Sequence, residues 1–151
     1  MQGLSEASDI ARRLSDNVKS AVIGKDAAIE LGLVCLFANG HLLIEDVPGL
    51  GKTTLAKSIA ISSGCSFKRI QFVPDILPSD ITGVNIYNQK TGEFEFRPGP
   101  LMTQVVLADE INRAPSKTQA ALLESMEERK LTVDGITYDL GRPFFIVATL
   151  N

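Results

Sequence analysis

The segment over residues 42–54, LLIEDVPGLGKTT, constrains the fold more than any other part of the sequence. Its first three residues form a short apolar run, which is typical of a central parallel strand. Pro48 and Gly49 then mark a turn, and Gly51 allows the backbone to approach a ligand closely. A helical pattern begins at Lys52. This order of strand, glycine-containing loop and helix predicts a phosphate-binding loop, in which backbone N–H groups and the helix dipole attract an anion.

The loop departs from the usual motif at one position. The pattern G-x-x-x-x-G-K-[ST] begins with a glycine, where this sequence has Asp46. An aspartate tolerates a left-handed turn and can bond nearby N–H groups, so it is compatible with such a loop. In this interpretation Lys52 contacts the β- and γ-phosphates and the Thr53 hydroxyl binds Mg²⁺. The alternative interpretation is an ordinary strand–turn–helix whose lysine lies on the surface.

A second polar cluster follows another apolar strand. Residues 105–108 form a short apolar run that ends in Asp109 and Glu110. Acidic residues at the carboxyl end of a buried parallel strand lie where open α/β sheets bind their ligands. One carboxylate there can hold the waters around Mg²⁺, and its neighbour can act as general base toward an attacking water. A later apolar run over 143–150 ends at Asn151, which either touches the γ-phosphate or that water, or simply ends the sequence.

The remaining pattern predicts helices at the start of the chain and hairpins toward its end. The segment 22–25, which contains Ile23 and Gly24, separates two helices and is a candidate adenine contact, although Gly24 alternatively only ends a helix. Ser116 is the expected N-cap of a later helix, and Ile61 is expected to face inward. The predicted elements are helices over 4–20, 26–39, 53–62 and 116–129, strands over 67–73 and 143–150, a loop over 74–80, and hairpins over 83–97 and 131–140.

Composition excludes several classes of protein. The 151 residues suffice for one domain, and the net charge of −3 gives no general nucleic-acid surface. Cys35 and Cys65 lack metal-ligand spacing, which favours free thiols in a reducing cytosol over a disulfide. The first 20 residues lack the apolar core of a signal peptide, and residues 31–38 are too few to span a bilayer. The sequence thus predicts a cytoplasmic protein.

Several longer stretches together resemble one family, the MoxR-type AAA+ ATPases, from about residue 18 to Asn151. The motifs that carry this resemblance are LIEDVPGLGKT at 43–53, RIQF at 69–72, PDILPSDITG at 74–83, FRPGP at 96–100, LADEINRAP at 107–115 and LESMEE at 123–128. Asp46 in place of the first glycine looks like a variation that the family itself uses.

The resemblance implies a P-loop NTPase fold of AAA+ type, an α/β three-layer sandwich with a central, mostly parallel sheet and β-hairpin insertions. Residues 1–20 would form an N-terminal helix and 21–151 the core, which is incomplete because the C-terminal lid would lie beyond sensor 1 at Asn151. The implied nucleotide-binding residues are Ile23, Gly24, Asp46, Val47, Pro48, Gly49, Leu50, Gly51, Lys52, Thr53 and Thr54. The implied catalytic residues are Lys52, Glu110 and Asn151, and the implied metal ligands are Thr53 and Asp109.

The function implied by the resemblance is Mg²⁺-dependent ATP hydrolysis coupled to chaperone-like remodelling or activation of partner complexes. The full-length form would be a hexameric ring, with a von Willebrand factor A domain protein as a frequent partner. Its hairpins, one resembling the helix-2 insertion and one the pre-sensor-1 hairpin, would engage the substrate. ATP is favoured over GTP by the resemblance alone. The arginine finger and sensor 2 would lie beyond Asn151, so we expect weak or no turnover from this chain alone.

Two other functions remain open at this stage. One is a nucleotide-responsive binding module without turnover, and the other is a subunit of a nucleic-acid motor. The hairpin tips at 88–90 and 134–135 carry little positive charge, which favours protein substrates over nucleic acid.

Overall fold

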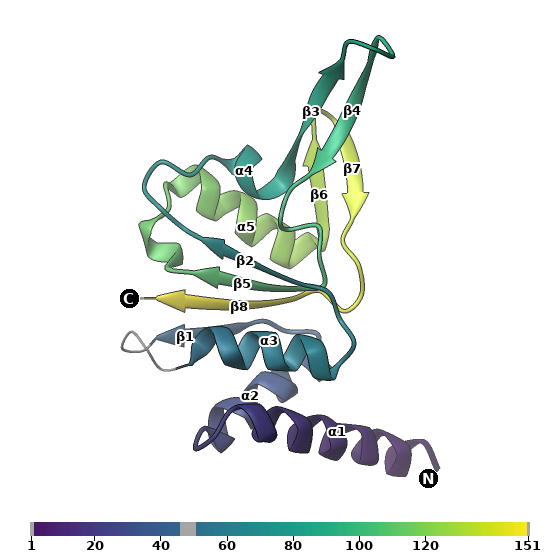
Figure 1. Ribbon diagram of the computed structural model, residues 1–151, viewed down its shortest axis with the longest axis vertical. Coiled ribbons are helices and arrows are strands. Elements are labelled where there is room, and N and C mark those ends of the chain that lie inside the picture. Colours follow the sequence, from purple (N-terminus) through teal and green to yellow (C-terminus); the bar gives the residue numbers. More distant parts are fainter. Residues whose placement is uncertain (1, 46–50, 151) are drawn as a thin grey trace.

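The computed structural model describes residues 2–45 and 51–150. The chain alternates helices and strands, and adds two hairpins to this pattern (Figure 1). In chain order the elements are α1 Gln2–Ala21, α2 Asp26–Phe37, β1 Leu42–Glu45, α3 Lys52–Ser62, β2 Phe67–Gln71, α4 Pro78–Thr82, β3 Gly83–Asn88, β4 Glu93–Pro98, β5 Val105–Asp109, the 3₁₀ helix η1 Ile111–Arg113, α5 Ser116–Glu128, β6 Lys130–Val133, β7 Ile136–Asp139 and β8 Phe145–Leu150.

Four strands form the central sheet in the order β1-β8-β5-β2, and all three pairings are parallel. The two middle strands, β5 and β8, are buried along almost their whole length. Their continuous apolar runs allow this burial, because a parallel sheet with both faces covered needs hydrophobic residues on both sides. The prediction of an α/β protein with a central parallel sheet is confirmed.

Helices cover both faces of the sheet and complete a three-layer sandwich (Figure 1). Alternate residues of β5 point to opposite faces, so Val105 and Leu107 pack with α1, α2 and α3. Val106 and Ala108 pack on the other side, with residues of α4 and α5. The N-terminal helix α1 belongs to this assembly, because its Val18 is fully buried in the first of these two cores.

The two predicted hairpins are confirmed, and they project together from one end of the molecule (Figure 1). The rings of Phe96 on β4 and Tyr138 on β7 stack with centroids 4.1 Å apart. Nearby, the Asn85 amide donates a hydrogen bond to Asp134 Oδ2 at 2.7 Å. The β3–β4 and β6–β7 hairpins are therefore joined to each other by side chains, and we call the pair the hairpin unit.

Three local predictions are wrong. The expected loop over 74–80 ends in a short helix, because Pro78 suits a first helical turn and the Asp80 carboxylate accepts the Leu77 N–H at 2.8 Å. Ser116 is the first helical residue of α5, and the N-cap position before it belongs to Pro115. Ile61, expected to face inward, is 68% exposed because the core contacts of α3 end with Ala60.

Two further features concern the cysteines and the length of the helices. Cys35 and Cys65 are both free thiols. Within residues 2–45 and 51–150, no helix combines the length and the apolar character needed to cross a bilayer.

Candidate functional site

The predicted phosphate-binding helix begins where the motif places it. Gly51 precedes α3 with φ 75° and ψ 20°, a left-handed conformation that glycine adopts without strain, and Lys52 is the first helical residue. Thr53 and Thr54 lie exposed in the first turn. The other loop residues of the prediction lie outside the described residues, as does Asn151; they are Asp46, Val47, Pro48, Gly49 and Leu50.

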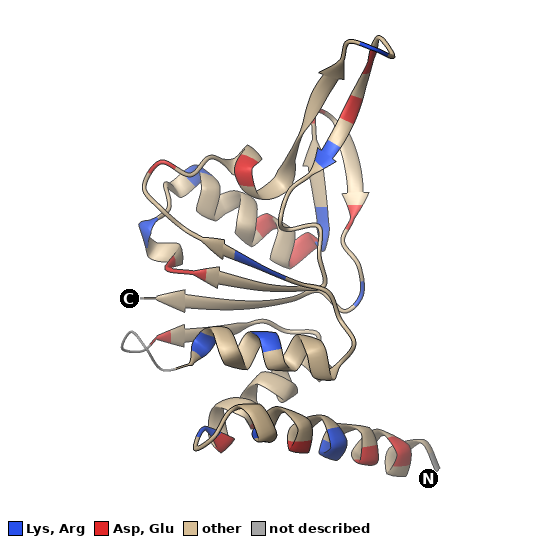
Figure 2. Ribbon diagram, viewed as in Figure 1, with Lys and Arg blue, Asp and Glu red and all other residues tan. Residues whose placement is uncertain are grey.

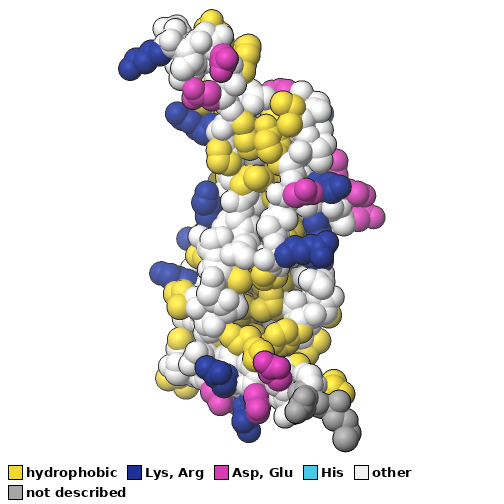
Figure 3. Space-filling model, turned by 90° about the vertical axis from the view of Figure 1, so that its right-hand side faces the viewer, with side chains coloured by type: hydrophobic (Ala, Val, Ile, Leu, Met, Phe, Trp, Pro, Cys, Tyr) yellow, Lys and Arg dark blue, Asp and Glu magenta, His cyan; other side chains and the backbone are white. Residues whose placement is uncertain are grey.

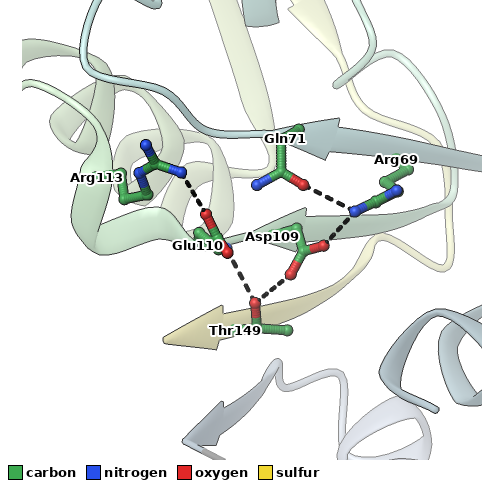
Figure 4. Close-up of polar contacts among 6 residues, drawn as sticks. All are labelled: Arg69, Gln71, Asp109, Glu110, Arg113 and Thr149. Atoms are coloured by element: carbon green, nitrogen blue, oxygen red, sulfur yellow. Dashed lines mark hydrogen bonds and ion pairs between the residues drawn. The ribbon is translucent and has the colours of Figure 1, made fainter. Parts of the chain in front are cut away.

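The Asp109 carboxylate ends β5 and is held by donors from both neighbouring strands (Figure 4). The Thr149 hydroxyl on β8 donates to Oδ1 at 2.5 Å, and the Arg69 guanidinium on β2 donates to Oδ2 at 2.6 Å. The same guanidinium nitrogen also donates to Gln71 Oε1 at 2.8 Å. These side chains meet because the parallel strands β2, β5 and β8 all end at the same edge of the sheet. Both oxygens of Asp109 therefore accept a hydrogen bond.

Opposing effects act on the pKa of the Asp109 carboxyl. Burial raises this pKa, but hydrogen bonds from Thr149 and Arg69 together with the positive charges of Arg69 and Lys52 outweigh the burial. The net result is a pKa below the ordinary value of 3.8, so the group is ionised at neutral pH. The start of α3, where Lys52 lies, is at the same end of the sheet as the end of β5 (Figure 1). The structure thus brings two sequence-predicted site residues together.

Glu110 leaves the strand in a left-handed conformation, with φ 59° and ψ 49°. Its backbone N–H donates to the Thr149 hydroxyl at 2.9 Å, and its carboxylate forms an ion pair with Arg113 Nη1 at 2.9 Å (Figure 4). A positive φ is uncommon in a residue other than glycine, and such conformations cluster at functional sites. The Thr149 hydroxyl thus uses its proton on Asp109 and a lone pair on Glu110, which fixes the two acids relative to each other.

The candidate adenine segment lies beside the start of α3. A cavity of about 70 Å³ is lined by Val22, Lys25, Ala28, Ile44, Gly51, Lys52 and Leu55. Val22 is buried there, whereas the Ile23 side chain is 89% exposed, and Gly24 supplies a left-handed turn with φ 74°. The segment 22–25 therefore borders α3 through Val22 and Lys25, and the Ile23 side chain points into solvent.

The oxygen donors at this edge suit a magnesium ion that arrives with phosphate groups. In the described part of the chain, no group of three or more His, Cys, Asp or Glu residues is placed to hold a metal ion alone. Mg²⁺ at phosphoryl-transfer sites keeps several waters and takes only one or two protein oxygens, with phosphate oxygens completing its shell. Asp109 and the exposed Thr53 hydroxyl offer oxygens of this kind. The residues present therefore fit the ion.

Sequence reasoning assigned no role to four residues of this cluster, Arg69, Gln71, Arg113 and Thr149. Arg69 and Gln71 stand in the sequence only as part of the motif RIQF, and Thr149 only as part of the apolar run over 143–150. Arg113 also received no role. The available signal for Thr149 was its position in the last residues of an apolar strand next to the one that ends in two acids. The partners of Arg69 depend on strand order, which the sequence does not state directly.

Comparisons with known proteins agree with this geometry. The family described as "ATPase family associated with various cellular activities (AAA)" matches residues 41–151. YeaC of Bacillus subtilis is 57% identical over 136 residues, which cover 90% of this chain and 42% of YeaC. Chaperone MoxR1 of Mycobacterium tuberculosis is 43% identical over 150 residues, which cover 99% of this chain and 40% of MoxR1. The chain thus spans about two fifths of the length of these relatives.

A solved structure has the same fold. The crystal structure of a candidate ATPase from Cytophaga hutchinsonii matches the whole chain with a TM-score of 0.81 and 40% sequence identity, and the match covers 48% of that protein. The expectation of an AAA+ type P-loop fold is therefore confirmed. The chain belongs to the AAA family of ATPases and, within it, to the MoxR group.

Proposed function

We propose that this chain binds ATP with Mg²⁺ at the edge of the sheet next to α3, and that the complete protein hydrolyses the nucleotide. The observation that supports this most is the arrangement of Asp109 and Glu110 around the Thr149 hydroxyl, close to Lys52 at the start of α3. Phosphoryl transfer is catalysed mainly by positioning and by electrostatic stabilisation, so a rigid set of charges is the device it needs.

Each residue has a distinct role in this proposal. Lys52 and the N–H groups at the start of α3 bind the phosphates, with the loop residues 46–50 and Thr54 as further contacts. Asp109 and Thr53 hold the metal ion, which when bound neutralises charge on the phosphate oxygens. Glu110 accepts a proton from the attacking water, and its ion pair with Arg113 orients the carboxylate. Asn151 orients the same water, and the segment with Ile23 and Gly24 contacts the adenine.

Nucleotide binding is tested by titrating the chain with fluorescent ATP in the presence of Mg²⁺. We expect Lys52→Ala to weaken binding by at least about tenfold, because a charged contact to phosphate is lost. Lys57→Ala, which removes an exposed lysine from the same helix, is the matched control and is expected to bind like the wild type. GTP should displace the ATP analogue poorly. Equal binding by Lys52→Ala and the wild type would contradict the proposed phosphate site.

Hydrolysis is tested with Glu110→Gln, in which the side chain keeps its size but loses its basicity. We expect nucleotide binding to be retained and the hydrolysis rate to fall by about 10²- to 10⁴-fold, the range typical of a general base. The measurement belongs in the longest available form of the protein. Unchanged hydrolysis in Glu110→Gln would remove Glu110 from the mechanism without affecting the binding site.

We further propose that the hairpin unit contacts a protein client in a ring-shaped, hexameric assembly, as in a chaperone that remodels partner complexes. Figure 3 shows hydrophobic side chains gathered at the hairpin end of the molecule. The exposed large hydrophobic residues of these strands are Val84, Ile86, Tyr87, Phe94 and Ile136. Phe94 is 72% exposed, and an aromatic side chain left open to water near a hairpin tip is suited to bind apolar side chains of a partner. A protein with a von Willebrand factor A domain is one proposed partner.

Client binding can be measured with fluorescein-labelled casein, an unstructured protein. Phe94→Ala combined with Tyr87→Ala is expected to weaken binding, whereas Ile61→Ala, an exposed apolar residue of α3, serves as the control. Figure 2 shows acidic residues between the basic ones along the hairpin unit, so the basic residues form no continuous track for a nucleic acid on the described part of these strands. Salt-dependent DNA binding that is lost in Lys90→Ala would instead support a nucleic-acid motor.

A further inference from the structure

Arg69 occupies a position that the proposed hydrolysis does not explain. It lies on β2, at the edge of the described sheet, and its guanidinium reaches the end of β5 to contact Asp109 Oδ2 at 2.6 Å. Gln71, two residues further along and therefore on the same face of the strand, accepts a second hydrogen bond at 2.8 Å. The side chain remains 48% exposed. A full positive charge thus rests directly on the carboxylate that the proposed function assigns to Mg²⁺.

We propose that Arg69 is a positioning residue that holds Asp109 in the metal-free site and competes with Mg²⁺ for its carboxylate. This inference rests on the proposed function, since it concerns the same metal-binding carboxylate. A hydrated Mg²⁺ is attracted by the same negative charge on Asp109 that Arg69 neutralises. Two cations that share one carboxylate repel each other, so either can be bound strongly only when the other moves away.

The two partners of Asp109 differ in how easily they can yield. The Thr149 hydroxyl belongs to a fully buried residue and is fixed by a second hydrogen bond, from the Glu110 N–H at 2.9 Å. Arg69 instead carries its charge on a long, half-exposed side chain, whose guanidinium can be solvated when it leaves the carboxylate. Arg69 is therefore the partner that moves when the metal ion arrives, and Thr149 keeps Oδ1 in place.

Gln71 offers a second contact that holds the Arg69 side chain after it leaves Asp109. The guanidinium has several donors, and one of them already contacts Gln71 Oε1. When Mg²⁺ takes over Asp109, Arg69 keeps this contact and stays at the sheet edge beside the site. The pair Arg69 and Gln71 thus acts as a reversible counter-charge: it keeps Asp109 correctly oriented before nucleotide binds, and it sets the Mg²⁺ concentration at which the site fills.

The test is a Mg²⁺ titration of nucleotide binding, with a fluorescent, non-hydrolysable ATP analogue as the probe. In Arg69→Met, which keeps the length of the side chain but not its charge, the Mg²⁺ concentration for half-maximal binding should fall by about three- to tenfold. This range allows for solvent screening of a half-exposed pair. Arg69→Lys keeps the charge and should stay within about twofold of the wild type. The difference between Arg69→Met and wild type should shrink at high salt.

Lys68→Met is the matched control, because it removes the same charge from the adjacent, exposed residue on the opposite face of β2. It should leave the Mg²⁺ midpoint unchanged. A midpoint in Arg69→Met that is unchanged, or that rises, would overturn the inference while leaving the proposed function intact. Failure of the wild-type chain to bind the analogue at any Mg²⁺ concentration would instead contradict the proposed function itself. Arg69→Lys keeps the positive charge but loses the planar guanidinium. If the Mg²⁺ midpoint fell in that variant too, the effect would come from the lost guanidinium geometry, and the proposed competition between Arg69 and Mg²⁺ would be overturned.

Discussion

The sheet edge around Asp109 and the hairpin unit differ in which side chains are exposed to water. At the sheet edge, Asp109 and Glu110 each have an arginine partner, and Thr149 is fully buried between them. In the hairpin unit, Phe94 is 72% exposed and its neighbour Tyr87 is 53% exposed. A polar hydroxyl is thus enclosed at one place and aromatic rings are open to water at the other, which is the reverse of the usual distribution.

This difference separates two physical requirements. Chemistry on a phosphate needs a carboxylate that does not reorient, and the sheet supplies this through the buried Thr149 hydroxyl, which contacts both Asp109 and the Glu110 N–H. Binding an apolar client needs hydrophobic surface that is not already buried in the protein's own core. A two-stranded hairpin that projects from the body can present such surface, and it is stabilised at its base by a second hairpin.

The largest effect that sharpens this comparison comes from the same substitution at two phenylalanines. Phe72 follows β2, is fully buried, and its N–H donates to the Asp109 carbonyl at 2.9 Å. Phe72→Ala leaves a cavity beside the site and is expected to lower the free energy of unfolding by about 3–5 kcal/mol. Phe94→Ala should lower it by less than about 0.5 kcal/mol, because little buried area is lost. Urea denaturation measures both, and a similar loss in the two variants would show that Phe94 belongs to a core.

A smaller effect is expected from two buried threonines. Thr149→Val removes the hydroxyl that contacts both Asp109 and the Glu110 N–H, so it should cost about 1–3 kcal/mol of stability and also weaken Mg²⁺-dependent nucleotide binding. Thr118→Val is the matched control: this residue is equally buried and donates to the Ile76 carbonyl at 2.7 Å, away from the site. It should lose stability while nucleotide binding is retained. Loss of nucleotide binding in both variants would trace the effect to unfolding rather than to Thr149.

The sequence predicts most of the fold because its strongest patterns are local. The apolar runs at 42–44 and 105–108 are strands, the run at 143–150 contains β8 from Phe145 onward, and both hairpins lie where turn residues separate alternating segments. The helix α4 was missed because its signal, Pro78 with Asp80 two residues later, competes with the turn signal of the surrounding prolines and polar residues. Ile61 was misplaced because helical spacing alone does not show where the neighbouring core ends.

Only the residues of the candidate site that belong to a local sequence motif are predictable from the sequence. Lys52, Asp109 and Glu110 stand at recognisable positions in the sequence, and the structure places them at one edge. Arg69 lies 40 residues before its partner Asp109, and their contact exists only because β2 is the neighbour of β5. Such a contact depends on strand order, which the sequence specifies through the packing of the whole core rather than through any local pattern.

His41, the single histidine of the chain, links the sheet to the helix that leads to the hairpin unit. Its Nδ1 accepts the Ile146 N–H at 3.0 Å, and its Nε2 lies 3.1 Å from the Met126 carbonyl of α5. Only the neutral imidazole with its proton on Nε2 satisfies both contacts. Burial lowers the pKa of His41 below 6.5, assisted by the charge of Arg129 and against the hydrogen bond to Met126.

A pH-dependent loss of stability follows from this lowered pKa. The unfolded chain binds a proton on His41 more readily than the folded chain, so stability is intact above pH 6.5 and decreases as the pH falls below that value. Thermal unfolding between pH 7.5 and 5.5 measures the decrease, and His41→Gln should abolish the pH dependence in that window. The lowered pKa of Asp109 acts only at more acidic pH, so the two transitions are separable. An equal decrease in His41→Gln would assign the transition to another group.

The smallest expected effect concerns the contact that joins the two hairpins. Phe96 and Tyr138 stack with an interplanar angle of 16°, and a double-mutant cycle with Phe96→Leu and Tyr138→Leu should give a coupling energy of about 0.5–1.5 kcal/mol. The same cycle on Tyr87 and Phe94, an edge-to-face pair with centroids 5.3 Å apart, should give less, because both rings are more exposed. If the outer pair coupled as strongly as the inner pair, its aromatic rings would stabilise the hairpin itself, and their exposure would no longer argue for a client-binding surface.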